Sequence, residues 1–440
     1  MSLSCNGTQS TIRAVMSSTA QTLPHVENNI IVTPKISYRM TKRISPFSKN
    51  DNYGGGFVEP NEFINLNVNS CEKNLWAPRA GARYDIYHEP SKTCAAIVTC
   101  GGLCPGLNDV IQSVTTKLID YGVEDILGIR HGFRGFYDDT IKPIRLDRSV
   151  VEGIQFHGGT VLGTSRGGAD IKNIVKKIDL WGVNMLFVVG GNGSHAGADA
   201  IRVELDKYNI DCCVVGIPKT IDNDIMLIDK SFGFDTAVEE AQKSLIAAKV
   251  EASSGYKGIG IVKLMGRQSG FVALNASLAS GVVDVCLIPE IPFSEDKLCA
   301  YIDQVINKNG HAVVCVAEGC GQSETSGIDA SGNPILTDVG NRLKKLFKST
   351  FPESDTKYID PSYLIRSTPT SSNDRIYCKV LSHNAVHAAM AGFTGVTTAL
   401  VNGHFCYLPI TEVIKEPRRV NPSGRSWNRL RASNSQPDLN

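Results

Sequence analysis

Two stretches of this chain repeat one pattern: a short apolar run, a glycine-rich turn and then a segment with helical spacing. In the first stretch the apolar residues 95–98 lead into a turn at 101–106, and in the second the residues 185–189 lead into a turn at 190–194. Apolar runs of this length are typical of buried strands, and helices between them imply that the strands run parallel. We therefore predict an α/β protein with doubly wound parallel sheets that carry helices on both faces.

Length and charge limit the classes of protein to which this chain can belong. At 440 residues it exceeds one average domain, so we expect two domains with additional terminal segments. The formal net charge is +1, which argues against nucleic-acid binding through bulk charge. No apolar run approaches the roughly 20 residues that a membrane helix needs. We therefore expect neither a nucleic-acid partner nor a membrane association.

The amino-terminal residues and the cysteines bear on the location of the protein. Residues 1–26 contain many Ser and Thr and no acidic residue, as organellar transit peptides do, but Arg13 is the one basic residue there. The 13 cysteines lie scattered in apolar runs, which is typical of reduced, buried thiols, and a redox switch is the alternative. We favour a cytoplasmic protein, with a plastid as the alternative location.

Three polar segments are predicted to lie outside the sheets. Residues 1–75 have the composition of an extended or partly disordered arm. Residues 321–356 form an insertion for which we expect a helix at 338–349, and the tail after Glu416 is basic and polar.

The loop at residues 216–225 is the most polar of the strand ends. It follows an apolar run and contains Lys219, Asp222 and Asp224. Polar groups at the carboxyl end of a strand lie where open α/β sheets bind ligands. Because the two aspartates are two residues apart in a loop, one can face a nucleophile while the other faces a metal ion. The alternative is a solvated turn, since Asp and Asn favour turns.

Charged residues follow other apolar runs as well. Arg166 lies in a third glycine-flanked turn, and Arg267 and Glu318 each follow a predicted strand. Glycine turns that open helices bind phosphate, and together with paired carboxylates and arginines they are the groups that metal-assisted phosphoryl transfer requires. The Walker-type phosphate loop is absent, and the dinucleotide fingerprint around Gly191 is only approximate.

Five of these segments occur in the order and approximate spacing of the phosphofructokinase family, namely residues 101–106, 190–194, 218–224, 265–267 and 317–319. The resemblance covers roughly residues 90–420, and residues 357–366 are most similar to the plant-type and trypanosomatid-type ATP-dependent branch. It implies two interleaved α/β domains with the active site in the cleft between them. It also implies phosphorylation of fructose 6-phosphate to fructose 1,6-bisphosphate, with ATP as co-substrate and Mg²⁺ as cofactor.

The resemblance assigns a role to each matching residue. Asp222 would take the proton from the sugar hydroxyl, Thr220 and Arg166 would bind the transferring phosphoryl group, and Asp224 and Asn192 would hold magnesium. The residues expected at the nucleotide are Gly102, Arg166, Gly191, Asn192, Gly193 and Ser194, with Lys219 as a further phosphate contact. Those expected at the sugar phosphate are Thr220, Asp222, Met265, Gly266, Arg267, Glu318, Lys357, Tyr363 and Arg366.

Two positions bear on the donor and on the metal. Pyrophosphate-dependent relatives carry Asp where this chain has Gly193, and glycine leaves room for ATP, so ATP is favoured and pyrophosphate is the alternative. Lys219 occurs with both donors. Most of the family has Asp where this chain has Asn192, and an amide keeps an oxygen but loses the charge that magnesium favours. We therefore expect an active enzyme with a stronger magnesium dependence, and a low-activity regulatory subunit is the alternative.

The resemblance further implies a division of the chain and an assembly. We expect an arm at 1–90, a nucleotide-binding domain at 91–233 and 367–415, and a sugar-phosphate domain with the tail at 234–366 and 416–440. Family members form dimers or tetramers, so we expect a homo-oligomer or a hetero-oligomer with sister subunits. In short-chain bacterial members a neighbouring subunit adds basic groups to the sugar-phosphate site. One such Arg is replaced here by Gly258, with Lys257 beside it.

Overall fold

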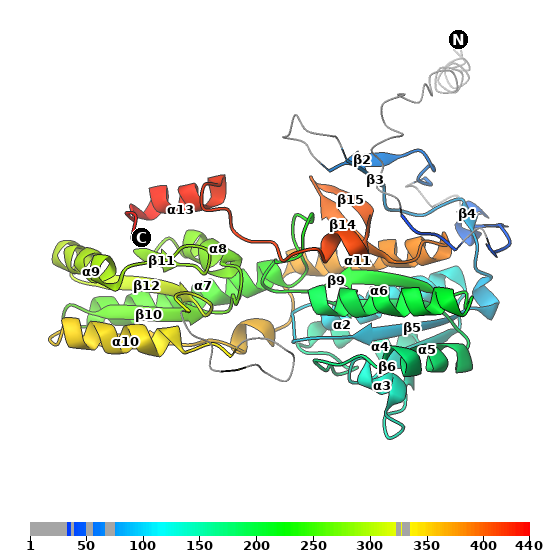
Figure 1. Ribbon diagram of the computed structural model, residues 1–440, viewed down its shortest axis with the longest axis horizontal. Helices are drawn as coiled ribbons and strands as arrows, with labels where there is room; N and C mark the ends of the chain where they lie inside the picture. Colours follow the sequence, from blue (N-terminus) through cyan, green and yellow to red (C-terminus); the bar gives the residue numbers. More distant parts are fainter. Residues whose placement is uncertain (1–32, 37–38, 50–55, 67–74, 323–326, 328–334) are drawn as a thin grey trace, which may run out of the picture.

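The computed structural model describes residues 33–36, 39–49, 56–66, 75–322, 327 and 335–440, and it has two lobes that lie side by side (Figure 1). One lobe is built on a seven-stranded sheet and the other on a four-stranded sheet. The remainder of the predicted amino-terminal arm and most of the predicted insertion lie outside the described residues.

The seven-stranded sheet is parallel except at its two edges. Its strands are, in order across the sheet, β15 (His404–Pro409), β14 (Val396–Val401), β9 (Cys213–Pro218), β8 (Val183–Gly190), β5 (Cys94–Thr99), β6 (Asp125–Ile129) and β7 (Ile144–Arg145). The outer strands β15 and β7 pair antiparallel with their neighbours.

Helices cover both faces of this sheet because alternate side chains of its strands are apolar on both sides. In β5, Ala95 and Ile97 pack in one core with α2 (Leu107–Tyr121) and α11 (Ser372–Met390). Ala96 and Val98 pack in a second core on the opposite face, with α5 (Ile171–Leu180) and α6 (Asn192–Lys207). The segment with helical spacing after the first glycine turn is α2.

The four-stranded sheet of the second lobe is parallel throughout. Its strands are, in order, β11 (Val285–Leu287), β12 (Ala312–Ala317), β10 (Ile259–Leu264) and β13 (Thr356–Ile359). One face packs on α7 (Phe234–Ser254) and α8 (Phe271–Ser280), the other on α9 (Glu295–Asn309) and α10 (Val339–Thr350). The helix expected at 338–349 is α10, and α13 (Arg425–Asn434) packs beside α8.

The chain passes between the lobes three times. It leaves the seven-stranded sheet after β9, returns from β13 into α11, and crosses again between α12 (Ile410–Val413) and α13. One core cluster includes residues of α2 and α11 together with residues of α7 and α8, so the two lobes share buried apolar surface. The predicted fold class, two interleaved doubly wound α/β units, is confirmed.

The described part of the amino-terminal region packs on the first lobe. Its backbone pairs with the chain after α11, where Ile36 N–H donates to Gly392 O at 2.9 Å, and with β15, where Ala80 N–H donates to Phe405 O at 2.9 Å. The short elements of the first lobe and this region are β1 (Arg43–Ile44), η3 (Pro46–Lys49), β2 (Phe63–Asn65), β3 (Trp76–Pro78), β4 (Asp85–Ile86), η4 (Pro90–Lys92), α3 (Arg134–Tyr137), α4 (Arg148–Val151) and η5 (Ile154–Phe156).

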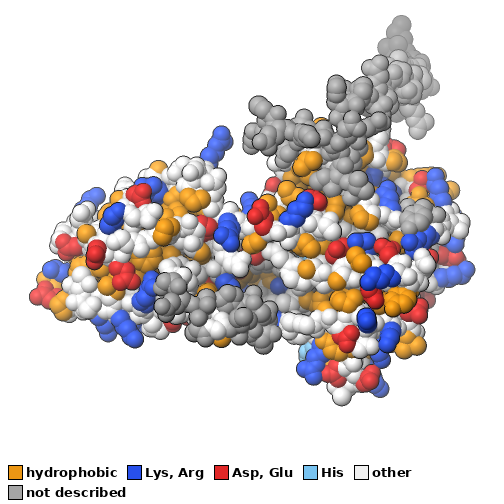
Figure 2. All heavy atoms as spheres, viewed as in Figure 1, with side chains coloured by type: hydrophobic (Ala, Val, Ile, Leu, Met, Phe, Trp, Pro, Cys, Tyr) orange, Lys and Arg blue, Asp and Glu red, His pale blue; other side chains and the backbone are white. Residues whose placement is uncertain are grey.

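The surface and the cysteines agree with the composition. Figure 2 shows acidic and basic side chains interspersed over both lobes on the face in view. Within the described ranges, no helix has the length and apolar content to cross a membrane. Eleven cysteines are described, all of them free, and all but Cys94 and Cys299 are buried, as expected for reduced thiols.

Candidate active site

Three loops of the first lobe meet at the carboxyl ends of β5, β8 and β9. These strands are adjacent and parallel, so the turns that follow them lie at one edge of the sheet. A methyl group placed on Gly101 would lie 3.5 Å from Lys219 Nζ and 3.9 Å from Ser194 Oγ. The three residues come from three different loops, so the structure brings together the turns that the sequence singled out.

The loop after β9 is held by hydrogen bonds of its own polar residues. Asn223 has a φ of 54°, in the left-handed region that Asn tolerates. Its Oδ1 accepts from Ser231 N–H at 3.0 Å, and Ser231 Oγ donates to Thr220 O at 2.6 Å. Asp222 N–H donates to Thr220 Oγ1 at 3.1 Å. The loop therefore presents Asp222 and Asp224 from a fixed backbone.

Three cations converge on Gly102. A methyl group placed there would lie 2.9 Å from Arg166 Nη2 and 3.1 Å from Arg366 Nη1, and Lys219 Nζ donates to Gly102 O at 2.7 Å. Burial lowers the pKa of Lys219, and the charges of Arg166 and Arg366 act in the same direction. Positive groups from separate segments that face one glycine form a site for an anion such as a phosphate.

The two aspartates after β9 resist ionisation. Burial raises the pKa of Asp222 to about 7, and repulsion from Asp224 and Glu318 adds to the shift, while Lys219 and Arg267 oppose it. Burial also raises the pKa of Asp224. Glu318 and Arg267 belong to the second lobe, so their influence on Asp222 indicates that the two lobes meet at this carboxylate.

The turn after β8 opens α6 beside these carboxylates. Asn192 Nδ2 donates to Asp224 O at 3.2 Å and to Asp224 Oδ2 at 3.3 Å. Gly191 is the residue before the helix, and a methyl group placed on Gly193 would meet no described atom within 4 Å. Gly193 therefore borders open space next to the backbone N–H groups that begin a helix, where phosphate binds readily.

The second lobe contributes two loops that pack tightly on each other. Gly319 N–H donates to Gly266 O at 3.1 Å, and a methyl group on Gly319 would lie 1.9 Å from Arg267 O. Gly266 has a φ of 137°, and a methyl group there would lie 2.5 Å from Ser269 O. Glycine is required at both positions. A side chain at residue 319 would separate the loops that carry Arg267 and Glu318, and one at residue 266 would clash within its own loop.

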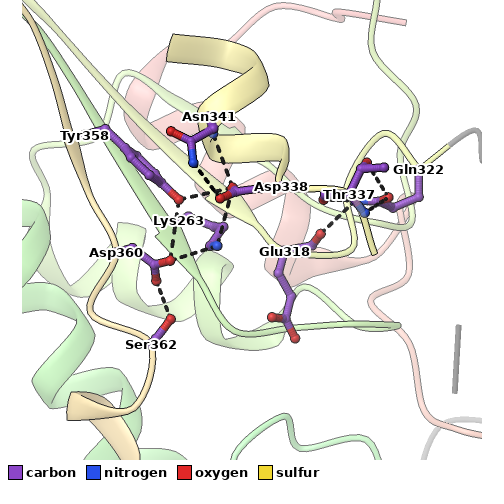
Figure 3. A network of polar contacts seen from close by, with 9 residues as sticks. All are labelled: Lys263, Glu318, Gln322, Thr337, Asp338, Asn341, Tyr358, Asp360 and Ser362. Atoms are coloured by element: carbon purple, nitrogen blue, oxygen red, sulfur yellow. Dashed lines mark hydrogen bonds and ion pairs between the residues drawn. The ribbon is translucent and has the colours of Figure 1, made fainter. Parts of the chain in front are cut away.

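Glu318 is held from behind by a polar network at the same edge of the sheet (Figure 3). Gln322 Nε2 donates to Glu318 O at 3.1 Å and to Thr337 O at 2.9 Å. In the adjoining part of the network, Lys263 Nζ lies 2.8 Å from Asp360 Oδ2. Figure 3 shows the Glu318 carboxylate directed away from these contacts. Burial raises its pKa, and Arg267 opposes this shift.

The remaining predicted sugar-phosphate residues lie in different places. Met265 is partly buried against the shared core. Arg366 lies at the end of η6 (Leu364–Arg366) and faces Gly102. Its guanidinium carbon stacks on the Tyr363 ring, 4.5 Å from the ring centroid. Tyr363 is 67% exposed.

The structure does not bring Lys357 to this cluster. It pairs with Gly260 near the amino end of β10, and its Nζ lies 3.1 Å from Asp355 Oδ2. The cluster lies at the carboxyl end of β10, which is about 13 Å further along the strand at 3.3 Å per residue. The expectation that Lys357 contacts the sugar phosphate of its own chain is therefore corrected.

Several residues that support the site were not singled out from the sequence as site residues. Ser269 Oγ donates to Asp222 O at 3.2 Å, and Glu290 accepts from Gly270 N–H at 3.0 Å. Glu290 follows an apolar run, as Glu318 does, so the same signal could have identified it. Gln322 and Arg418 lie in polar segments without a pattern that marks them.

The carboxylate loop fits a magnesium ion that also binds substrate phosphates. Asn192 Oδ1 and Asp222 Oδ1 are buried and have no hydrogen-bond partner within the described part of the chain. A divalent cation held by Asp224 and Asn192 would offset the repulsion between the aspartates. No group of three His, Cys, Asp or Glu that could hold a metal occurs among the described residues. Magnesium suits such a site, since it takes one or two carboxylates and completes its shell with phosphate and water.

Comparison with known proteins agrees with this geometry. The sequence model of the phosphofructokinase family matches residues 94–389. The ATP-dependent 6-phosphofructokinase 5, chloroplastic, of Arabidopsis thaliana is 52% identical over 83% of this chain and 70% of its own length. The ATP-dependent 6-phosphofructokinase of Trypanosoma brucei brucei is 43% identical over 80% of this chain and 75% of its own length.

A solved structure supports the fold alone. The pyrophosphate-dependent phosphofructokinase of Marinobacter aquaeolei superposes with a TM-score of 0.68 at 19% identity, over 78% of this chain and 91% of that chain. The family match spans the strands, loops and helices that carry the cluster, and the sequence relatives exceed 40% identity over most of the chain. This chain belongs to the phosphofructokinase family.

Proposed function

We propose that this chain transfers the γ-phosphoryl group of ATP to the 1-hydroxyl of fructose 6-phosphate, as an ATP-dependent 6-phosphofructokinase. The observation that carries the proposal is the place of Asp222. It lies between the cations around Gly102 in the first lobe and Arg267 with Glu318 in the second. Phosphoryl transfer to a hydroxyl needs a base that lies between the groups binding the donor phosphates and the polar groups binding the acceptor.

In the proposed reaction, Asp222 removes the proton as the new bond forms. The 1-oxygen of the sugar attacks the γ-phosphorus, the bond to the β-phosphate oxygen breaks, and the proton moves to the Asp222 carboxylate. A pKa of about 7 suits this role, because a base acts best when its pKa lies near the working pH. Arg267 and Glu318 orient the sugar so that its hydroxyl faces Asp222.

The charge on the transferring group is stabilised by fixed cations. Arg166 and Lys219 lie on the side of the first lobe, and Arg366 joins them from η6. We assign the sugar phosphate to Arg366 and Tyr363, and the nucleotide phosphates to Arg166 and the α6 turn. When bound, magnesium supplies further positive charge to the phosphate oxygens. The fold holds these three cations in place before the substrates bind, so that they need not reorganise during the transfer.

ATP is proposed as the donor because of Gly193. The space beside it is open, whereas a carboxylate there would crowd and repel the α-phosphate. Relatives at 52% and 48% identity are named ATP-dependent. Asn192 is compatible with activity, since its amide oxygen is free of other partners in the described structure and its amide donates to Asp224. This favours an enzyme over a regulatory subunit.

We further propose an oligomer in which Lys357 serves a neighbouring chain. Lys357 and Lys257 both lie toward the amino ends of the second sheet, near Tyr256, which is 69% exposed. A methyl group on Gly258 would lie 2.1 Å from Ala252 O, so this backbone has no room for the arginine that other members carry there. Because this end of the sheet lies about 13 Å from the site of its own chain, we assign Lys357 to the site of a neighbouring subunit.

We also propose the domain boundaries and the cellular location of the protein. We keep residues 91–233 with 367–415 as the nucleotide-binding domain and 234–366 with 416–440 as the sugar-phosphate domain. Relatives named chloroplastic and relatives without that word both match well. We propose the cytoplasm with the plastid as alternative, which a fluorescent fusion of the full chain distinguishes.

The role of Asp222 is tested by its isosteric amide. We expect Asp222→Asn to lower kcat with ATP by about 10²–10⁴-fold, because the base is lost. Binding of fructose 6-phosphate, measured by calorimetry on the same protein, should stay within about twofold since an amide keeps the shape of the site. A variant that turns over at the wild-type rate would remove Asp222 from its assigned role.

A further inference from the structure

The third crossover between the lobes passes directly behind the candidate active site. It comprises residues 414–424, between α12 and α13, and in Figure 1 it is the red segment that runs between the lobes to α13. The sequence of this segment is basic and polar, and nothing in it resembles a catalytic motif. Its contacts nevertheless fall on the backbone of both halves of the site.

On the first lobe, Arg418 binds the loop that carries the two aspartates. Its backbone N–H donates to Asp224 O at 2.8 Å. Its guanidinium Nη1 donates to Ile228 O at 3.0 Å and to Asp229 O at 2.9 Å. One arginine therefore holds this loop at Asp224 and again at residues 228–229.

On the second lobe, the same segment holds the loop that carries Arg267. The Arg418 guanidinium stacks on the Phe271 ring at 4.9 Å, and Phe271 is the first residue of α8. Val420 N–H donates to Glu290 Oε1 at 2.8 Å. The Glu290 carboxylate also accepts from Gly270 N–H, at 3.0 and 3.1 Å. Both contacts fix the start of α8, which begins four residues after Arg267.

A direct contact joins the two loops in front of this segment. Ser269 Oγ, from the second lobe, donates to Asp222 O at 3.2 Å. Ser269 is 1% exposed, so the bond lies away from water, where an unmade hydrogen bond would be costly. The loop that carries Asp222 and the loop that carries Arg267 are thus joined by one direct hydrogen bond. They are joined a second time through Arg418.

We propose that Arg418 is a positioning residue, which sets the distance between the half of the site that binds phosphate and the half that binds sugar. Each substrate would bind mainly to one lobe, whereas transfer needs the hydroxyl, the phosphorus and Asp222 aligned together. Lysine is a poor substitute, because it lacks the planar group that donates to carbonyl oxygens while stacking on Phe271. This inference rests on the proposed function for its kinetic part.

The experiment compares Arg418→Ala and Arg418→Lys with Arg419→Ala, the exposed neighbour on the same segment. We expect Arg418→Ala to lower kcat by about 10–10²-fold through misalignment. The dissociation constants of ATP and of fructose 6-phosphate, each measured alone, should change less than about threefold. Arg418→Lys should be intermediate, and Arg419→Ala should match the wild type. Unchanged kcat in Arg418→Ala, or equal losses in both dissociation constants, would overturn the proposal.

Hydrogen exchange tests the same inference without the reaction. In Arg418→Ala, the amides of residues 222–229 and of 265–271 should exchange faster together, while those of β5 keep wild-type rates. Exchange that rises in only one of the two loops, or in neither, contradicts the proposal even if the chain proves to have another activity.

A second variant covers the case in which Arg418→Ala does not fold. Ser269→Ala removes the direct bond to Asp222 O and should lower kcat by about tenfold, with both dissociation constants retained. Wild-type kcat in this variant would show that the alignment of the two loops does not limit turnover, and the proposal would fail.

Discussion

The two halves of the site are held together by different means. In the first lobe, the groups that we propose to bind phosphate contact the same residue: Lys219 donates to Gly102 O at 2.7 Å, and Arg166 lies against that glycine. In the second lobe, Arg267 and Glu318 project from loops that are held from behind, by Gln322 and by Glu290 through Gly270. The phosphate half is therefore held mainly by contacts among its own residues, with Arg418 bound to the backbone of the aspartate loop. The loops of the sugar half instead depend on the supporting side chains of Gln322 and Glu290.

This difference explains what the sequence could predict. Direct contacts arise where a strand ends in glycine and polar residues, and that local pattern is enough to predict Gly102, Arg166, Asp222 and Ser194 as site residues. Support from behind comes from residues such as Gln322, which lies four residues after Glu318, and Arg418, which is distant in the chain. Both lie in polar segments without periodicity. Only the three-dimensional structure places them at the site.

After the loss of the base itself, the largest effect is expected where the phosphate half is most crowded. Gly102→Ala would place a methyl group 2.9 Å from Arg166 and 3.1 Å from Arg366 and displace both guanidinium groups. We expect kcat/KM to fall by about 10²-fold, since small displacements of positioned groups have effects of this size. Gly168→Ala is the matched control, because a methyl group there meets no described atom within 4 Å. Equal activity of the two variants would show that the cations do not act at Gly102.

The sugar half should respond less strongly and to one substrate. Gln322→Ala removes the bonds to Glu318 O and to Thr337, so Glu318 would lose its support. We expect KM for fructose 6-phosphate to rise about tenfold, from the loss of one to two hydrogen bonds. KM for ATP is the internal control and should not change. A rise in KM for ATP of the same size would contradict the division into two halves.

Asn192 lies in the phosphate half of the site, and we expect it to set the affinity for magnesium. Asn192→Asp replaces the amide that donates to Asp224 by a carboxylate that repels it. Without magnesium, Tm should therefore fall; with magnesium, the added charge should lower the half-saturating concentration by about three- to tenfold. The readouts are Tm and activity across a magnesium titration. A magnesium dependence that is unchanged or weaker would count against the assignment of Asn192 to the metal.

The smallest effect at neutral pH concerns the stability of the two lobes. Burial lowers the pKa of His88 and His195 to about 4 and of His387 to about 3, and all three lie in or beside the seven-stranded lobe. Their side-chain partners are a thiol, a hydroxyl and a phenol, none of which carries a negative charge. The Gly191 carbonyl beside His195 Nδ1 opposes the lowering of the pKa of His195, but burial outweighs it. The second lobe, at residues 234–366, contains one histidine, His311, which is half-buried.

The sign of the pH effect follows from the lowered pKa values. A histidine that is neutral when folded stabilises the fold above its unfolded pKa of about 6.5, and this contribution is lost as the pH falls toward 4. Between these values, hydrogen exchange should rise in β8 and β9 before it rises in β10 and β12. The reverse order would contradict this assignment of acid sensitivity to the first lobe.

The parallel α/β class and most of the loops at the site follow from the sequence, because apolar runs and glycine turns are local signals. The order of the strands across each sheet comes from the structure. The prediction for Lys357 was wrong. Its position in a familiar segment suggested a contact with the sugar phosphate, but the register of β13 against β10 places it at the opposite end of the sheet. Register is a property of two strands together, and one strand's residues do not determine it.

The most direct test of the central claim is turnover of fructose 6-phosphate by the purified full chain, with ATP or pyrophosphate as donor, across a magnesium titration. We predict fructose 1,6-bisphosphate with ATP and magnesium and none with pyrophosphate, because Gly193 leaves space for the nucleotide. Activity with pyrophosphate would contradict the role of Gly193 in donor choice. Absence of product with both donors would contradict the proposed function and favour a regulatory subunit.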